Sequence, residues 1–92
     1  MKFEWDAKKA AENLAKHGVD FEDALVVFSD PLRIETEDKR KDYGETRTNT
    51  TGKADTLLVA TVTHTDRDGI TRLISARPAS RKERKEYHGQ NN

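Results

Sequence analysis

Arginines concentrated toward the C-terminal end are the residues of this chain best suited to chemistry. Residues 64–92 contain seven Lys/Arg and four Asp/Glu, a net charge of +3, whereas residues 1–63 contain ten and thirteen, a net charge of −3. Five of the seven are arginines, whose planar guanidinium groups make paired hydrogen bonds to phosphate or carboxylate. The pattern predicts a partner that carries such groups. A solvated basic helix would show the same charge, and charge alone does not separate the two.

Arg72 and Arg77 flank an apolar stretch that alternates like a strand. Successive side chains of a strand point to opposite faces, so this odd spacing places the two arginines on opposite faces. A bulge, or the end of the strand before Pro78, would re-aim Arg77. Arg77, at a strand–helix junction, is the better candidate for binding phosphate. Arg72 fits equally well as a surface residue whose stem lies along the sheet.

The last predicted helix presents a basic row. Arg81, Arg84, Lys85 and His88 occur at i, i+3, i+4 and i+7, near one helical face, where they could follow a phosphate backbone or form a plain exposed surface. Tyr87 in the same helix could stack on a base. Taken alone, its spacing favours a place in the core.

Glu45 and His64 are the candidates for accepting a proton. Glu45 and Arg47 alternate onto one face, either as a structural ion pair or as a base held ionised by its neighbour. His64 ends the most apolar strand, and its ordinary pKa of about 6.5 suits acid–base work, although a lone histidine is more often structural. The three histidines are far apart in sequence and there is no cysteine, so we expect neither a metal site nor a cofactor.

The spacing of apolar residues predicts an α+β domain with the order β-α-α-β-β-β-β-α. Short turns between consecutive strands imply an antiparallel sheet with helices packed on it. In the first helix, the expected core-facing residues are Ala7, Ala10, Ala11, Leu14 and Ala15. We expect turns at 52–55 and 66–69, strands at 3–5, 32–35, 46–51, 57–62 and 70–76, and helices at 7–17, 21–28 and 79–87.

Length and composition set the remaining expectations. With 92 residues, the chain is expected to form one domain, with a loose tail at 89–92. No apolar run approaches the roughly 20 residues that span a membrane, and the N-terminus has no apolar signal segment. Together with the lack of cysteine, this predicts a cytoplasmic protein with no membrane partner.

Separated motifs in the chain resemble one known family, the BrnT toxins. The N-terminal part shares Phe3-Glu4-Trp5-Asp6, Lys9, Asn13, Lys16-His17-Gly18-Val19, Phe21 and Ala24. The rest shares Asp30-Pro31, Gly44-Glu45, Arg47, Gly52, residues 72–77, Ala79, Glu83-Arg84 and Tyr87. The resemblance covers nearly the whole chain in the right order. The chain departs from the family at Thr48-Asn49-Thr50-Thr51, where the strand is usually apolar.

The resemblance implies a RelE-like ribonuclease fold in the toxin of a type II toxin–antitoxin pair. It also implies a BrnA-like antitoxin with a ribbon-helix-helix domain, in a two-plus-two complex that binds operator DNA only through the antitoxin and represses its own operon. We expect acidic antitoxin residues opposite Arg77, Arg81 and Arg84, because complementary charge gives an interface specificity.

Our own assignment of roles follows from RNA chemistry. RNA is cut when its 2′-hydroxyl attacks the neighbouring phosphate, a reaction that arginines can assist without a metal by stabilising charge. We assign Arg77 and Arg72 to the phosphate, with Arg47 and Arg67 as supporting cations. The base is His64 or Glu45, and Tyr87 stacks or donates a proton. Arg81, Arg84 and Lys85 bind RNA. The rival interpretation is a non-catalytic co-repressor module whose acidic N-terminal half binds a basic partner.

Overall fold

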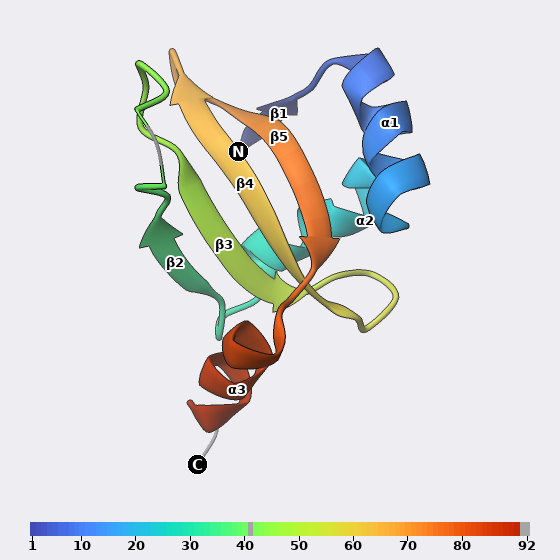
Figure 1. The fold of residues 1–92 in the computed structure, drawn as a ribbon, viewed down its shortest axis with the longest axis vertical. Helices are drawn as coiled ribbons and strands as arrows, with labels where there is room; N and C mark the ends of the chain where they lie inside the picture. Colours follow the sequence, from blue (N-terminus) through green and yellow to red (C-terminus); the bar gives the residue numbers. More distant parts are fainter. Residues whose placement is uncertain (41, 91–92) are drawn as a thin grey trace.

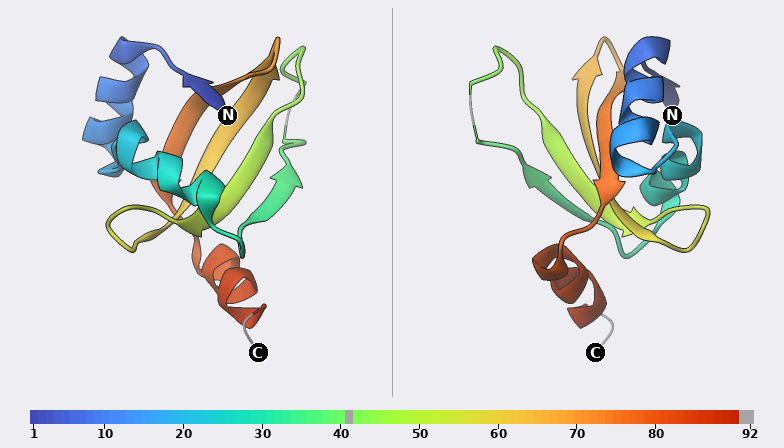
Figure 2. Two further views of the ribbon diagram at one scale, coloured as in Figure 1. Left: turned by 180° about the vertical axis from the view of Figure 1, so that it is seen from behind. Right: turned by 45° about the vertical axis from the view of Figure 1, so that its right-hand side comes forward.

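The computed structural model describes residues 1–40 and 42–90, which form a five-stranded sheet with helices on both sides. Figure 1 and Figure 2 show the short helix α2 and the 3₁₀ helix η1 crossing one face, α1 beside the β5 edge, and α3 at one end of the opposite face. The elements are β1 Lys2–Glu4, α1 Ala7–His17, α2 Phe21–Ala24, η1 Leu25–Ser29, β2 Ile34–Glu37, β3 Thr48–Lys53, β4 Val59–Arg67, β5 Ile70–Pro78 and α3 Arg81–Gly89.

The sheet is mixed, with the strand order β1-β5-β4-β3-β2. Four strands pair antiparallel as expected, but β1 pairs parallel to β5, so the prediction of an all-antiparallel sheet is wrong. A parallel pair needs a long connection, and the whole chain between β1 and β5 provides it. The N-terminal strand can therefore fill the free edge of the last strand.

The α+β class and the order of the elements are as the sequence predicted, but several boundaries differ. The second helix is α-helical only over Phe21–Ala24 and then tightens to 3₁₀ geometry, which is common at helix ends. The turn expected at 52–55 begins later, because Gly52 and Lys53 still pair with β4. The helix expected at 79–87 is shifted to Arg81–Gly89, so the tail expected to be loose begins inside α3. Gln90 donates to the Leu32 carbonyl at 2.6 Å, and residues 91–92 lie outside the described part.

The main core lies between the sheet and the pair formed by α2 and η1. Val62 and Ala76 of the sheet meet Phe21 and Val27, all at most 1% exposed, and Trp5 packs edge-on against Phe21 with ring centroids 5.8 Å apart. None of the helices in the described part of the chain is long and apolar enough to cross a membrane.

Helix α1 does not bury the apolar stripe that its spacing predicted. Ala10 contacts the core, but Leu14 is 47% exposed, and the buried residue is Asn13. The Asn13 amide nitrogen donates to the carbonyls of Val19 at 3.0 Å and Ala76 at 2.7 Å, and its Oδ1 accepts from the Ala76 N–H at 3.1 Å. Asn13 thus occupies the hydrogen-bonding edge of β5 beyond the last residue that β1 pairs, and this requirement sets which face of α1 turns inward.

A β-bulge in β5 decides where the arginines point. Thr63 pairs with Ser75, but the next residue of β4, His64, pairs with Leu73, so Ile74 is an extra residue in β5. Thr61 lies opposite Arg77 and Thr65 lies opposite Arg72. Because these two threonines are four residues apart in an unbulged strand, Arg72 and Arg77 lie on the same face. The prediction that they lie on opposite faces, which assumed a regular strand, is therefore wrong, because the bulge adds one residue between them.

We predict that Asn13→Ala lowers the free energy of unfolding by about 2–3 kcal/mol, because it leaves the Ala76 N–H and two carbonyls without their buried partner. Asn13→Asp should be at least as unstable at neutral pH, since it sets a carboxylate against those carbonyls. Chemical denaturation measures both, with Glu12→Ala at an exposed neighbouring position as the matched control. Equal stability of Asn13→Ala and Glu12→Ala would contradict the stabilising role of the Asn13 hydrogen bonds.

Candidate functional site

The face of the sheet opposite α2 and η1, here called the open face, has a floor of threonines. Thr61, Thr63 and Thr65 of β4 are at most 5% exposed and point to this face. Thr61 Oγ1 is 2.7 Å from Thr51 Oγ1, Thr63 donates to Asn49 Oδ1 at 2.6 Å, and Thr65 donates to a backbone carbonyl at 2.7 Å. Each hydroxyl is held by a partner, so the floor is polar and rigid.

Arg77 lies on this floor at the end of β5 and is joined to helix α3. Its two terminal nitrogens contact the Glu83 carboxylate at 2.7 and 3.1 Å. Glu83 also accepts from the Ser80 N–H at 2.8 Å, within a capping box that begins α3. Burial acts to raise the pKa of Glu83, but the hydrogen bonds from Arg77 and Ser80 outweigh it and lower this pKa to about 2.

A second group of charges, here called the loop network, runs from the loop before β3 to the end of β4. Arg67 Nη2 and Arg47 Nε contact the two oxygens of Glu45 at 3.1 and 3.3 Å. The Arg47 guanidinium stacks 3.8 Å above the ring of Tyr43, whose hydroxyl donates to Asp38 at 3.3 Å. The hydrogen bond from Arg67 is the largest influence on Glu45 and lowers its pKa.

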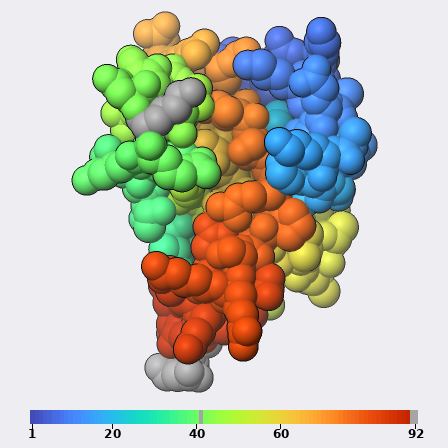
Figure 3. Space-filling model, in the orientation of Figure 1, coloured from blue at the N-terminus to red at the C-terminus, as the bar shows by residue number. Residues whose placement is uncertain are grey.

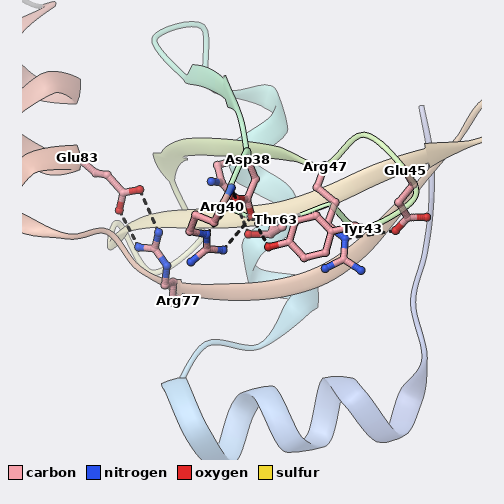
Figure 4. A network of polar contacts seen from close by, with 9 residues as sticks. Asp38, Arg40, Tyr43, Glu45, Arg47, Thr63, Arg77 and Glu83 are labelled. Atoms are coloured by element: carbon pink, nitrogen blue, oxygen red, sulfur yellow. Dashed lines mark hydrogen bonds and ion pairs between the residues drawn. The ribbon is translucent and has the colours of Figure 1, made fainter.

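Asp38 anchors the other end of the loop network. Its carboxylate is 1% exposed and accepts two hydrogen bonds from Arg40, at 2.9 and 2.8 Å, while the Arg40 side chain is 71% exposed. The hydrogen bonds from Arg40 lower the pKa of Asp38 to about 2. Figure 4 shows these side chains in one line with Arg77 and Glu83 along the sheet.

The structure brings five of the ten predicted site residues to one face. Arg47, Arg67 and Glu45 meet in the loop network, and Arg77 and Arg72 share the open face with them. Arg72 is 3.4 Å from a carboxylate oxygen of Glu4, its neighbour on β1. Each of these arginines therefore has a carboxylate partner.

His64 is not among them. It pairs with Leu73 and points to the helix-covered face, where its ring meets Phe28 edge-on at 4.9 Å between centroids. Its Nε2 is 2.7 Å from the Thr50 hydroxyl, and burial lowers the pKa of its ring. The sheet separates His64 from the arginines, so the geometry favours the structural role.

Of the predicted site residues on helix α3, Tyr87 is buried and the basic residues are exposed. Tyr87 is 1% exposed, so it is unable to stack on a base in this conformation, and its hydroxyl donates to Asp30. Burial, with this bond, raises the pKa of Tyr87 to about 12. Arg81 and Lys85 are exposed, and Arg84 is also exposed while its Nη1 donates to the Ala79 carbonyl at 2.7 Å.

Two hollows adjoin the loop network. The space-filling view in Figure 3 shows the loop (green) beside the surface of β5 (orange). One has a volume of about 340 Å³ and is lined by residues that include Asp38, Tyr43 and Glu45. The other, of about 280 Å³, shares Glu45 and Thr46 and adds Thr65. Glu45 is therefore reachable from both sides. Among the described residues, no three His, Cys, Asp or Glu side chains gather as metal ligands.

Sequence reasoning missed four members of the site. Asp38 and Arg40 belong to a run of charged residues for which no site was predicted. Tyr43, to which no role was assigned from the sequence, is half-buried against Arg47. The position of Glu83 could have been predicted from the sequence. Ser80 is followed three residues later by this glutamate, and that spacing is the pattern of a capping box at the start of a helix.

We predict that stability falls with acid between about pH 5 and pH 2. Asp38 and Glu83 have pKa values of about 2 in the folded protein, below their ordinary 3.8 and 4.5, so the unfolded chain binds protons first. Their stabilisation is present above the unfolded values and is lost as the pH falls through the folded ones. In thermal melts across this range, the melting temperature of the double variant Asp38→Asn/Glu83→Gln should depend less steeply on pH than that of the wild type. A slope equal to that of the wild type would contradict the assignment.

Comparison with known proteins agrees with this architecture. The family model described as the ribonuclease toxin BrnT of type II toxin–antitoxin systems matches residues 5–83. The crystal structure of the Brucella abortus ribonuclease toxin BrnT is similar with a TM-score of 0.66 and 29% identity, over 88% of this chain and 99% of that one. A comparison with curated proteins gave no match. Since the family model covers most of the sequence, the chain belongs to the BrnT family of ribonuclease toxins of type II toxin–antitoxin systems.

Proposed function

We propose that the open face cuts RNA by attack of a 2′-hydroxyl on the adjacent phosphate, without a metal ion. The observation that carries the proposal is the bulge at Ile74, which sets Arg72 and Arg77 on one face with Arg47 and Arg67. In the reaction the 2′ oxygen forms a bond to phosphorus and loses its proton. The bond to the 5′ oxygen breaks, and that oxygen takes up a proton. The products are a 2′,3′-cyclic phosphate and a 5′-hydroxyl end.

The arginines would stabilise the negative charge that develops on the phosphoryl oxygens. A guanidinium has five N–H donors in a fixed plane, so a carboxylate that takes two of them leaves others for phosphate. The partner carboxylates hold each guanidinium in place before RNA binds, which is the preorganisation that electrostatic catalysis requires. The buried threonines beneath them fix this arrangement to the sheet.

Glu45 is our candidate for the base that accepts the 2′-hydroxyl proton. It lies on the open face, it is reachable from two hollows, and Arg67 and Arg47 hold it ionised. A lowered pKa makes a carboxylate a weaker base but keeps it ready to accept a hydrogen bond at neutral pH. We prefer Glu45 to His64, which faces the other side of the sheet.

We infer the partner from family membership and from charge. A toxin of a type II pair needs an antitoxin, and we propose a BrnA-like protein whose ribbon-helix-helix domain dimerises to give a two-plus-two, operator-binding complex in the cytoplasm. Arg81, Lys82 and Lys85 are exposed on α3 next to Arg77, so an acidic antitoxin segment can cover helix and site together. We also propose that the fold is RelE-like.

The non-catalytic co-repressor is the rival proposal, and one observation favours it. Every arginine of the open face that we assign to chemistry already has a carboxylate partner, as a structural surface would. Purified wild-type protein that binds its antitoxin but never shortens RNA would support this rival.

We predict that Arg77→Ala lowers the rate of RNA cleavage by about 10²–10³-fold, the usual effect of removing one charge-stabilising donor. The ion pair with Glu83 indicates a loss of about 1 kcal/mol in the free energy of unfolding, because a half-buried carboxylate loses its partner. Gel analysis of a labelled oligoribonucleotide measures the rate, and thermal melts measure the stability.

The double variant Arg77→Ala/Glu83→Gln separates the two effects. Removing the orphaned charge should recover part of the stability while cleavage stays low. Wild-type cleavage by the double variant would overturn the role of Arg77. Arg77→Lys, which keeps the charge but not the paired hydrogen bonds, should cleave at an intermediate rate.

We predict that RNA cleavage is unchanged by an excess of chelator, because guanidinium groups, and not a bound cation, supply the positive charge in this mechanism. The measurement is the cleavage rate of antitoxin-free protein in EDTA, compared with the rate in added magnesium. Loss of activity in EDTA that magnesium restores would contradict the proposed chemistry.

A further inference from the structure

A basic groove lies between α1 and β5, outside the site described above. It has a volume of about 300 Å³ and is lined by Lys9, Glu12, Asn13, Lys16, His17, Ile74 and Ser75. On the helix, Lys9, Asn13, Lys16 and His17 fall at i, i+4, i+7 and i+8, one face of α1. The groove exists because β1 stops pairing at Arg72, which leaves the rest of this β5 edge to α1. Figure 3 shows α1 (blue) bordering β5 (orange) on the side of the open face.

The charge of the groove is positive in a part of the chain that is otherwise acidic. Helix α1 carries Lys8, Lys9 and Lys16 against Glu12, whereas residues 1–63 together carry a net charge of −3. Lys9 and Lys16 are exposed, so their ammonium groups can reach a ligand while their stems lie along the groove. Asn13, between them, uses its amide on the backbone and forms a fixed floor.

The groove also continues from the open face. Ser75, at its β5 wall, pairs with Thr63, which lies in one cross-strand row with Asn49. Strands are spaced about 4.8 Å apart, so the β5 wall of the groove lies one strand spacing from the middle of the threonine floor. A nucleic acid strand that crosses the floor perpendicular to the β-strands would leave it over Ser75 and enter the groove.

We propose that this groove binds the phosphate backbone of the RNA substrate one or more nucleotides away from the cleaved bond, through Lys9 and Lys16. The inference rests on the proposed ribonuclease function and adds to it a second binding subsite. It assigns a role to a cluster of residues that the proposed chemistry leaves unused. The groove positions substrate and contains no catalytic residue.

The test uses Lys9→Ala/Lys16→Ala in the full chain, with Lys2→Ala/Lys8→Ala as a control of equal charge outside the groove. Fluorescence anisotropy with a single-stranded 2′-O-methyl oligonucleotide measures binding, because this probe lacks the attacking hydroxyl. We expect roughly tenfold weaker binding for the groove variant near 0.1 M salt. The slope of log K against log salt should be smaller in magnitude by about 1.4 than for the wild type, since each of the two lost phosphate contacts on a single strand contributes about 0.7. Cleavage of a long oligoribonucleotide should show a raised KM and an unchanged kcat, while a dinucleotide should be cut as by the wild type.

The outcomes separate the two proposals. If the groove variant binds the oligonucleotide more weakly than the wild type, but the wild type never cleaves RNA, the groove is supported and the ribonuclease function is refuted. Cleavage with equal KM for the groove and control variants would refute the groove alone. No binding and no cleavage by the wild type would refute both. A groove variant that binds the oligonucleotide normally but loses the antitoxin would assign the groove to a protein partner and overturn the proposal.

Discussion

The single extra residue in β5 is the feature on which the arrangement of the site depends. Without the bulge at Ile74, Arg72 and Arg77 would face opposite sides of the sheet, and one of them would be directed into the layer of α2 and η1. The bulge occurs where β5 passes from β1 to the Asn13 side chain as its edge partner. An amide side chain can satisfy both the N–H and the carbonyl of Ala76, so the strand stays ordered beyond the reach of β1. The position of Arg77, the next residue, follows from that bond.

Each arginine of the open face that we assign to the candidate site is paired with a carboxylate. Unpaired guanidinium groups crowded on one face would repel each other and would sample many rotamers. The loop network instead holds Arg40, Arg47 and Arg67 with only Asp38 and Glu45, so it keeps an excess of positive charge while fixing each group. Within Thr48–Thr51, Asn49 and Thr51 lie on the open face and bond to the threonines of β4, which explains why these two positions of the strand are polar.

The parts of the molecule that sequence could predict are those set by local rules. Caps, such as Asp6 and Gly18 of α1, and the apolar run at the start of β4 identify the elements and their order. The face of α1 was predicted wrongly, since periodicity counts apolar residues and gives no weight to a buried asparagine whose partner lies 63 residues away. The same limit applies to the site. Alternation found Glu45 with Arg47, but the bulge that joins Arg72 to Arg77 and the sheet that separates His64 from both depend on register.

The site is also held by contacts that close only in the complete fold. Tyr87 donates to Asp30, and Asp30 also accepts from the Lys53 N–H at 2.9 Å, so one carboxylate joins α3 to the end of η1 and to β3. Gly52 permits this, because a Cβ there would lie 3.2 Å from both Asp30 and Val27. The docking of α3 in turn places Glu83 opposite Arg77. Residues outside the candidate site therefore set the geometry of its guanidinium groups, and a chain with a core this small assembles this site only as part of the whole fold.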